Sequence, residues 1–150
     1  MTMPSDLTSH LGYWLRYVSN HVSQAFARKL EDRGVTVAEW VLLRALYDVE
    51  RIAPSRLSEQ MGMTRGAITK LADRLIAKAL IVRDANPADA RAQTLTLIPA
   101  GRDLVPQLSA LADQNDLEFF SHLTLAERQS LEATLKDIVA RRGLTSIPIN

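Results

Sequence analysis

A mainly helical fold that carries one small β-hairpin is predicted for this 150-residue chain. Along most of the chain, apolar residues recur at spacings of three and four, the period of an amphipathic α-helix. Residues 81–98 instead contain two short strand-like runs separated by turn residues. The length suits one domain, and the chain shows no internal repeat or interdomain linker.

The N-terminal third predicts two helices. Apolar residues at helical spacing indicate one long amphipathic helix that ends before Gly34, formed by Leu7, Leu11, Leu15, Val18, Val22, Phe26 and Leu30. Thr36 and Glu39 then form a capping box, in which two side chains satisfy free N–H groups at a helix start. The helix that follows, residues 40–49, is apolar on nearly every side, so we expect it in the core.

Two shorter helices joined by a turn are predicted next. Residues 51–53 are an extended connector, and Pro54 or Ser55 opens a helix that ends near residues 61–62. Thr64 caps the second of these helices, whose inward stripe consists of Ile68, Leu71, Leu75 and Ile76.

A hairpin is predicted directly after this helix. Residues 81–83 and 94–98 are its strands, with the turn beginning at residues 86–87. Arg91 is placed at the tip, and Asp89 two residues earlier can orient its guanidinium. Taken alone, the two would be an exposed ion pair of little energy.

The C-terminal third predicts two more helices. One begins at residues 99–100 and contains Pro106, which should kink or delay its hydrogen-bond ladder. Thr124 and Glu127 form a second capping box ahead of a helix whose apolar residues are Leu131, Leu135, Ile138 and Val139. An apolar tail follows at residues 144–149, which a monomer would have trouble covering.

Charge is unevenly distributed, although the net charge is only +1. Residues 51–102 hold nine Arg or Lys against four acids, a net of +5, and the remainder carries −4. This split indicates a middle segment that meets a polyanion. On charge alone, a solvated basic surface explains it equally well.

The order helix, short helix, turn, helix, hairpin is that of a winged helix-turn-helix. An α-helix fits the major groove of B-DNA, where each base pair presents a distinct pattern of donors and acceptors. Arg65 and Thr69 share one face of the second helix, as do Lys70 and Arg74, and the hairpin beside it can reach the minor groove. The candidate DNA-binding residues are Ser55, Arg56, Thr64, Arg65, Gly66, Ala67, Thr69, Lys70, Arg74, Asp89 and Arg91.

Residues 55–101 resemble the core of the multiple-antibiotic-resistance regulator (MarR) family. The hairpin pattern of that family is present as Asp89, Arg91, Leu95, Leu97 and Gly101, and the resemblance extends to the flanking helices. Two positions depart from it. Ala79 stands where a Gly usually closes the DNA-reading helix, and Ile98-Pro99 stands where a Thr often follows the second strand. An Ala at a cap with φ > 0 carries a steric cost.

The resemblance implies a homodimeric DNA-binding repressor with no cofactor. Residues 1–34 and 100–150 would form its dimerisation helices, and residues 35–99 its DNA-binding lobe. Two lobes would meet successive major grooves of a pseudo-palindromic operator, with half-sites about 34–36 Å apart. A winged-helix module that binds an acidic protein without specific DNA binding remains the alternative.

Members of this family are often released from DNA by small aromatic or phenolic acids bound between the dimerisation helices and the lobe. The candidate ligand-binding residues are His10, Tyr13, Trp14, Tyr17 and Trp40. Aromatic residues at helical spacing are more often part of a core or a dimer interface, so that interpretation stays open.

Several classes of function are not expected. The chain has no Cys, which excludes disulfides and thiolate zinc sites. It has no apolar run of about 18 residues and no signal-peptide pattern at its start, so a cytoplasmic protein is expected. His10 and His21 lie about 16 Å apart along a helix, too far to share a metal, and no catalytic or nucleotide-binding motif is present. We therefore expect no enzyme.

Overall fold

The computed structural model describes residues 2–86 and 88–149, without the side chains of residues 86 and 89–92. This part of the chain forms six α-helices and a two-stranded sheet. In chain order the elements are α1 (Leu11–Glu31), α2 (Val37–Tyr47), α3 (Pro54–Met61), α4 (Arg65–Ala77), β1 (Ile81–Asn86), β2 (Asp89–Leu97), α5 (Pro99–Phe120) and α6 (Leu125–Arg142). The predicted fold class, with its order of helices and hairpin, is confirmed.

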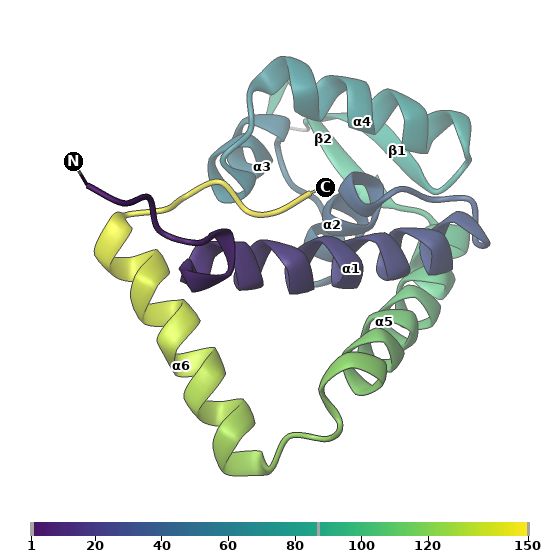
Figure 1. Cartoon of the computed structure of the whole chain (residues 1–150). Helices are drawn as coiled ribbons and strands as arrows, with labels where there is room; N and C mark the ends of the chain where they lie inside the picture. Colours follow the sequence, from purple (N-terminus) through teal and green to yellow (C-terminus); the bar gives the residue numbers. More distant parts are fainter. Residues whose placement is uncertain (1, 87, 150) are drawn as a thin grey trace.

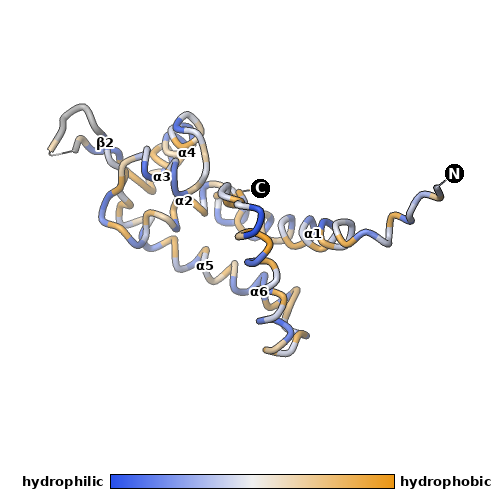
Figure 2. Tube along the Cα trace, turned by 90° about the vertical axis from the view of Figure 1, so that its left-hand side faces the viewer, coloured by the Kyte–Doolittle hydropathy of each residue, from blue (hydrophilic) through white to orange (hydrophobic). Residues whose placement is uncertain are grey.

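The helices form a triangular frame beneath a compact lobe (Figure 1). α1 crosses the middle of the molecule, while α5 and α6 form a V below it whose apex is the turn at residues 121–124. α2, α3, α4 and the hairpin lie above α1. The hairpin and the N-terminus extend in opposite directions (Figure 2).

The hydrophobic core lies in the lobe around α2. Leu42, Leu43 and Leu46 are at most 1% exposed, as predicted for a helix that is apolar nearly all round. The neighbouring helices and strands contribute Leu57, Met61, Ile68, Leu71, Leu75, Ile81, Leu95 and Leu97. Each fully buried aliphatic side chain contributes about 1.5–3 kcal/mol, so this core fixes the shape of the lobe.

Local hydrogen bonds define the helix starts. Thr36 Oγ1 accepts the Glu39 N–H, and Glu39 Oε1 accepts the Thr36 N–H. Thr124 and Glu127 make the same pair of bonds at the start of α6. Pro54 is the first residue of α3, where its missing N–H needs no partner. Both predicted capping boxes are confirmed.

α1 begins later than predicted. A short 3-10 turn occupies Leu7–Ser9 and His10 is extended, so the helix starts at Leu11. Trp14 Nε1 donates to the Thr8 carbonyl at 2.9 Å, which fixes this segment outside the helix. The apolar spacing therefore predicted one helical turn too many.

α5 continues through Pro106 as one helix, so the predicted interruption does not divide it. The carbonyl of Arg102, which Pro106 cannot bond, belongs to an exposed residue that water can reach. In the first turn of α5, Gly101 packs on the segment that follows α4. A Cβ at this position would overlap the Leu80 carbonyl oxygen, so the crossing requires Gly.

The hairpin is longer than predicted. β1 and β2 pair from Ile81–Leu97 to Ala85–Gln93, and an irregularity follows at Ala85/Asn86. The added residues are mostly polar and pair through the backbone, so no apolar alternation marked them. Ile52 and Leu95 exchange backbone hydrogen bonds of 3.1 and 2.8 Å, which confirms the extended connector.

The turn after α4 keeps a left-handed conformation although it holds an Ala. Ala79 has a φ of 59°, the only positive φ at a non-Gly residue in the described chain. Its N–H bonds the Ile76 carbonyl at 2.9 Å, and the Leu80 N–H bonds the Leu75 carbonyl at 3.1 Å. These are the paired bonds of a left-handed helix cap, formed here without Gly.

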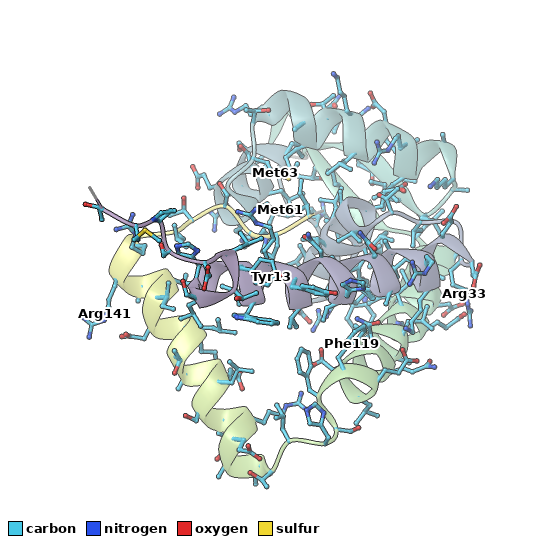
Figure 3. The ribbon with its side chains drawn as sticks, viewed as in Figure 1. Tyr13, Arg33, Met61, Met63, Phe119 and Arg141 are labelled. Atoms are coloured by element: carbon cyan, nitrogen blue, oxygen red, sulfur yellow. The ribbon has the colours of Figure 1, made fainter. Side chains whose placement is uncertain are left out.

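α1 and α6 leave large apolar side chains exposed. No residue of α6 is buried, and Phe119 of α5 points into the interior of the frame (Figure 3). The exposed side chains of the two helices include Leu11, Trp14, Leu15, Val18, Leu125, Leu131, Leu135, Ile138 and Val139. Contiguous apolar surface of this kind marks an interaction site. None of the described helices has the length and hydrophobicity needed to span a membrane.

The C-terminal tail, residues 144–149, turns back onto its own lobe (Figure 1). Ile149 packs against the core and Pro148 faces α1, α2 and α5. Leu144 and Ile147 stay 57% and 39% exposed. The single chain therefore covers only Ile149 in part, and the expectation that a monomer has trouble covering the tail holds for residues 144–148, which are exposed.

Candidate DNA interface

α4 presents two unlike faces. Ile68, Leu71 and Leu75 are at most 4% exposed and pack in the core. Thr64 caps the helix, its Oγ1 accepting the Ala67 N–H at 3.1 Å. The outward residues, all exposed, are Arg65, Gly66, Thr69, Lys70 and Arg74. Burial and capping thus match the prediction, with only Ala67 half-buried.

Four exposed cations of the lobe lack an internal counter-charge. Within the part of the chain that the structure describes, Arg56, Arg65, Lys70 and Arg74 form no ion pair. Arg74 differs, because its guanidinium donates to Thr36 Oγ1 at 3.5 Å and so lies at the seam between α4 and α2. Unpaired cations on an outward helix face are available to phosphates and base edges.

α3 and the turn after it support α4 from below. Arg56 is exposed on α3, whereas Ser55 is half-buried at the helix start. α3 ends at Gly62, which has a φ of 62°. Ser58 Oγ donates to the Met63 carbonyl, and the Met63 N–H donates to the Ser58 carbonyl at 3.1 Å. Two hydrogen bonds between Ser58 and Met63 therefore hold the turn between α3 and α4.

Lys78 anchors the C-terminal end of α4 to the start of α2. Its Nζ donates to Glu39 Oε1 at 2.9 Å and to the Gly34 carbonyl at 2.7 Å. Glu39 Oε2 lies 2.8 Å from the same nitrogen but makes no directed hydrogen bond. Burial raises the pKa of the Glu39 carboxyl, yet hydrogen bonds from Lys78 and the Thr36 backbone outweigh it, so the pKa lies below 4.5.

Arg83 of β1 anchors the hairpin to α4. Its guanidinium donates to Asp73 Oδ1 at 2.8 Å. The net charge of +5 over residues 51–102 already counts Asp73 against Arg83. It still overstates the charge free to meet a polyanion, because Arg51 and Lys78 pair with Glu50 and Glu39, which lie outside this range. No local sequence pattern indicates the Lys78–Glu39 and Arg83–Asp73 pairs, since the partners lie 39 and 10 residues apart.

The outer end of the hairpin is described only through its backbone. Arg91 lies in β2 beyond the pairing irregularity, whereas Ala88 is in the turn, so Arg91 is near the tip but not in the turn itself. The orientation of the Arg91 guanidinium by Asp89 concerns side chains outside the described part of the structure. Both residues remain predicted DNA contacts.

The aromatic residues of α1 form a ladder. The Tyr17 ring stacks on Trp14 at 6.4 Å and on His21 at 5.3 Å, and Tyr13 contacts both Trp14 and Tyr17 edge-on. Trp14 and Tyr17 are 50% and 51% exposed. His10 contacts the N-terminal segment instead. Sequence reasoning missed His21 as a member of the ladder.

Trp40 is separate from the ladder, so the predicted ligand set is divided. It lines a hollow of 270 Å³ between α1, α2, α5 and the tail, together with Val22, Ser23, Phe26, Val37, Val41, Ala112, Asn115, Asp116 and Pro148. Asn115 is 3% exposed, accepts from Lys29 Nζ at 2.9 Å and donates to the Val22 carbonyl at 3.1 Å. Val22 and Phe26 were predicted as part of the α1 stripe, but nothing in the sequence placed Pro148 beside them.

Comparison with known proteins identifies the family of the chain. The model of the MarR family matches residues 33–92, from the end of α1 into β2. A candidate transcriptional regulatory protein for the hcr operon of Thauera aromatica is 30% identical over 132 residues, 87% of this chain and 80% of that protein. The chain belongs to the MarR family. It is a DNA-binding transcriptional regulator with a winged helix-turn-helix, not an enzyme.

Solved structures of other MarR-type regulators have the same fold. BpsR of Bordetella bronchiseptica, whose DNA binding is regulated by 6-hydroxynicotinic acid, aligns with a TM-score of 0.78 at 26% identity, over 91% of this chain and 97% of that one. A MarR variant from Escherichia coli complexed with operator DNA aligns with a TM-score of 0.77 at 26% identity, over 86% and 93% of the two chains. The fold of this MarR-family regulator is thus one seen both with DNA and under control by a small aromatic acid.

Proposed function

We propose that this MarR-family regulator is a homodimeric repressor of a pseudo-palindromic operator, released by a small aromatic or phenolic ligand. The observation that carries the proposal is the outward face of α4, where Arg65 and Lys70 are exposed and form no ion pair with any described residue. Such cations gain counterion-release energy from phosphates and bidentate bonds from guanine. Repression then requires only that the occupied operator exclude the polymerase.

The exposed apolar surface supports dimerisation through residues 1–34 and 100–150. α5 and α6 enclose a hollow of 480 Å³ lined by Phe120, Leu131, Leu135 and Val139, among others. A second copy that covers this surface also takes up the Arg128–Asp116 and Lys136–Glu132 ion pairs, which line the same hollow and are already paired within the chain. The lobe of residues 35–99 then repeats about 34–36 Å away, one turn of duplex.

The DNA-facing residues divide by role. We assign Arg65, Thr69 and Lys70 to base edges and phosphates in the major groove. Thr69 Oγ1 donates to the Arg65 carbonyl at 2.9 Å, so its lone pairs remain free to accept from a base. Gly66 and Ala67 allow close approach. The remaining predicted contacts position the lobe on the backbone or in the minor groove, and they are Ser55, Arg56, Thr64, Arg74, Asp89 and Arg91.

The Trp40 hollow suits the ligand better than the α1 ladder does. It is concave and mostly apolar, with Ser23, Asn115 and Asp116 as polar groups at its wall. Among the described residues that line it, none is basic. Asp116 is paired with Arg128 at 3.2 Å, and Asn115 accepts from Lys29 Nζ at 2.9 Å, so the charges at this wall are balanced within the chain. The hollow therefore suits either an aromatic acid or a phenol.

Duplex binding by an Arg65→Ala variant tests the proposed function. If Arg65 reads a base edge, the variant should lose about 1–3 kcal/mol of operator binding and discriminate less at one position. Arg28→Ala is the matched control, because Arg28 is an exposed arginine on α1 that forms no ion pair within the described residues, and its loss changes the net charge equally.

Salt dependence separates DNA binding from the alternative function. Operator affinity should fall steeply with salt, with a slope of about −0.9 per phosphate contact. If Arg65→Ala lowered the affinity by the same factor for every duplex sequence, Arg65 would contact phosphate and read no base. Absence of duplex binding at low salt would instead favour the winged-helix module that binds an acidic protein.

A further inference from the structure

The C-terminal tail bonds to the end of α3, at the helix-turn-helix turn. The Ile147 N–H donates to the Met61 carbonyl at 3.4 Å, and Ser146 Oγ donates to the Gly62 carbonyl at 3.2 Å. Carbonyls at a helix C-terminus lack partners within the helix. The tail supplies partners to two of them, so residues from the far end of the chain take part in fixing the turn that precedes α4.

Gly62 leaves room for this contact. A Cβ built on Gly62 would lie 2.7 Å from Ser146 Cα and 2.8 Å from the Thr145 carbonyl oxygen, closer than such atoms approach. The tail backbone therefore lies directly on the bare Cα of the turn. The left-handed φ of 62° is a separate reason for Gly at this position, and the two reasons can be tested apart.

The other end of the same segment forms a wall of the Trp40 hollow. Pro148 lines that hollow, and Ile149 packs against the core. Ser146, which bonds Gly62, and Pro148, which lines the hollow, are thus two residues apart in the tail, about 7 Å of extended chain. A shift at one end of so short a segment is transmitted to the other.

We propose that residues 144–149 are a strap through which occupancy of the Trp40 hollow is sensed at the helix-turn-helix turn. A ligand that fills the hollow displaces Pro148 and thereby withdraws Ser146 and Ile147 from α3. While docked, the strap fixes the lobe relative to the end of α6, which favours binding of two half-sites at one spacing. Coupling to a ligand rests on the proposed function, whereas docking of the strap does not.

The docking is tested with two glycine variants in full-length protein. At Gly62, an Ala would be strained by the left-handed φ and its Cβ would also overlap the tail. At Gly34, where φ is 77° and no atom lies within 4 Å of the added Cβ, an Ala would be strained by the left-handed φ alone. Trp14→Phe in both leaves Trp40 as the only Trp. Acrylamide quenching of Trp40 should rise about twofold in Gly62→Ala and stay unchanged in Gly34→Ala, because only the first opens the hollow locally.

A chain that ends at Gly143 provides the second variant. It should show the same rise in Trp40 quenching, remain a dimer in sedimentation, and bind operator about tenfold more weakly, within the usual range of allosteric coupling. Equal quenching in the two glycine variants, or unchanged quenching and affinity in the shortened chain, would overturn the strap. A monomeric shortened chain would also overturn it, because the tail would then belong to the subunit interface.

The two proposals fail in different ways. Absence of operator binding by the unmodified chain would overturn the proposed function and the coupling with it. Loss of the contrast between Gly62→Ala and Gly34→Ala, with operator binding intact in the unmodified chain, would overturn the strap alone.

Discussion

Replacing Ala79 by Gly should stabilise the protein without changing what it binds. Ala79 has a φ of 59° in the cap that ends α4. A left-handed residue with a Cβ costs about 1–2 kcal/mol, and Gly loses about 0.4–1 kcal/mol more entropy on folding, so the net gain is about 0.5–1 kcal/mol. For a domain of this size, 1 kcal/mol corresponds to about 2–4 °C in Tm.

Urea unfolding at fixed protein concentration measures the effect, because the stability of the proposed dimer would depend on concentration. The matched control is Ala27→Gly, an exposed position within α1, where the same substitution should cost about 1 kcal/mol. The two variants should thus shift the midpoint in opposite directions at unchanged slope. A loss of stability in Ala79→Gly comparable to that in Ala27→Gly would refute the left-handed strain, and weakened operator binding would show that the turn contacts DNA.

Three further predictions concern the anchoring of α4, the hairpin and the subunit interface. Glu39→Gln should cost about 1–3 kcal/mol near pH 7, since it breaks the ion pair of a buried carboxylate with the part-exposed Lys78. The folded pKa of Glu39 is lowered, so its contribution is present above pH 4.5 and lost at lower pH, and urea melts of the two proteins should converge in acid. Arg91→Ala should weaken operator binding with an unchanged circular dichroism melt, and Asp89→Ala should weaken it less; tighter binding by the Asp89 variant would contradict its orienting role. Leu135→Glu should give a folded monomer by sedimentation with weak operator binding, because Leu135 is 39% exposed in the single chain and lies in the surface that we assign to the second copy.

Features that depend on neighbouring residues could be predicted from the sequence. The capping boxes at Thr36 and Thr124 need only a hydroxyl and a carboxylate three residues apart, and both are present in the structure. The inward stripe of α4 follows from helical periodicity, which also sets which of its side chains face outward. Family resemblance and burial therefore agree on the face that carries Arg65.

Features that depend on tertiary contacts could not be predicted in the same way. Trp40 and Tyr17 are both aromatic residues on adjacent helices, yet only the packing of α1 on α2 and α5 decides that they face different spaces. Lys78 and Glu39 are 39 residues apart, so their pairing produces no periodic pattern in the sequence. The return of Pro148 to the hollow depends on the direction in which α6 leaves the apex of the frame.

Gly101 gives the long helix α5 a mechanical role. Because no atom fits between Gly101 and the Leu80 carbonyl, α5 cannot slide or tilt at this crossing without moving the segment that follows α4. Phe120 lies 19 residues beyond Gly101, about 28 Å along the helix, so a rotation of about 10° at the crossing displaces the Phe120 end by about 5 Å. In the proposed dimer, a change in subunit packing at Phe120 therefore acts through α5 on the segment that leads from α4 into the hairpin.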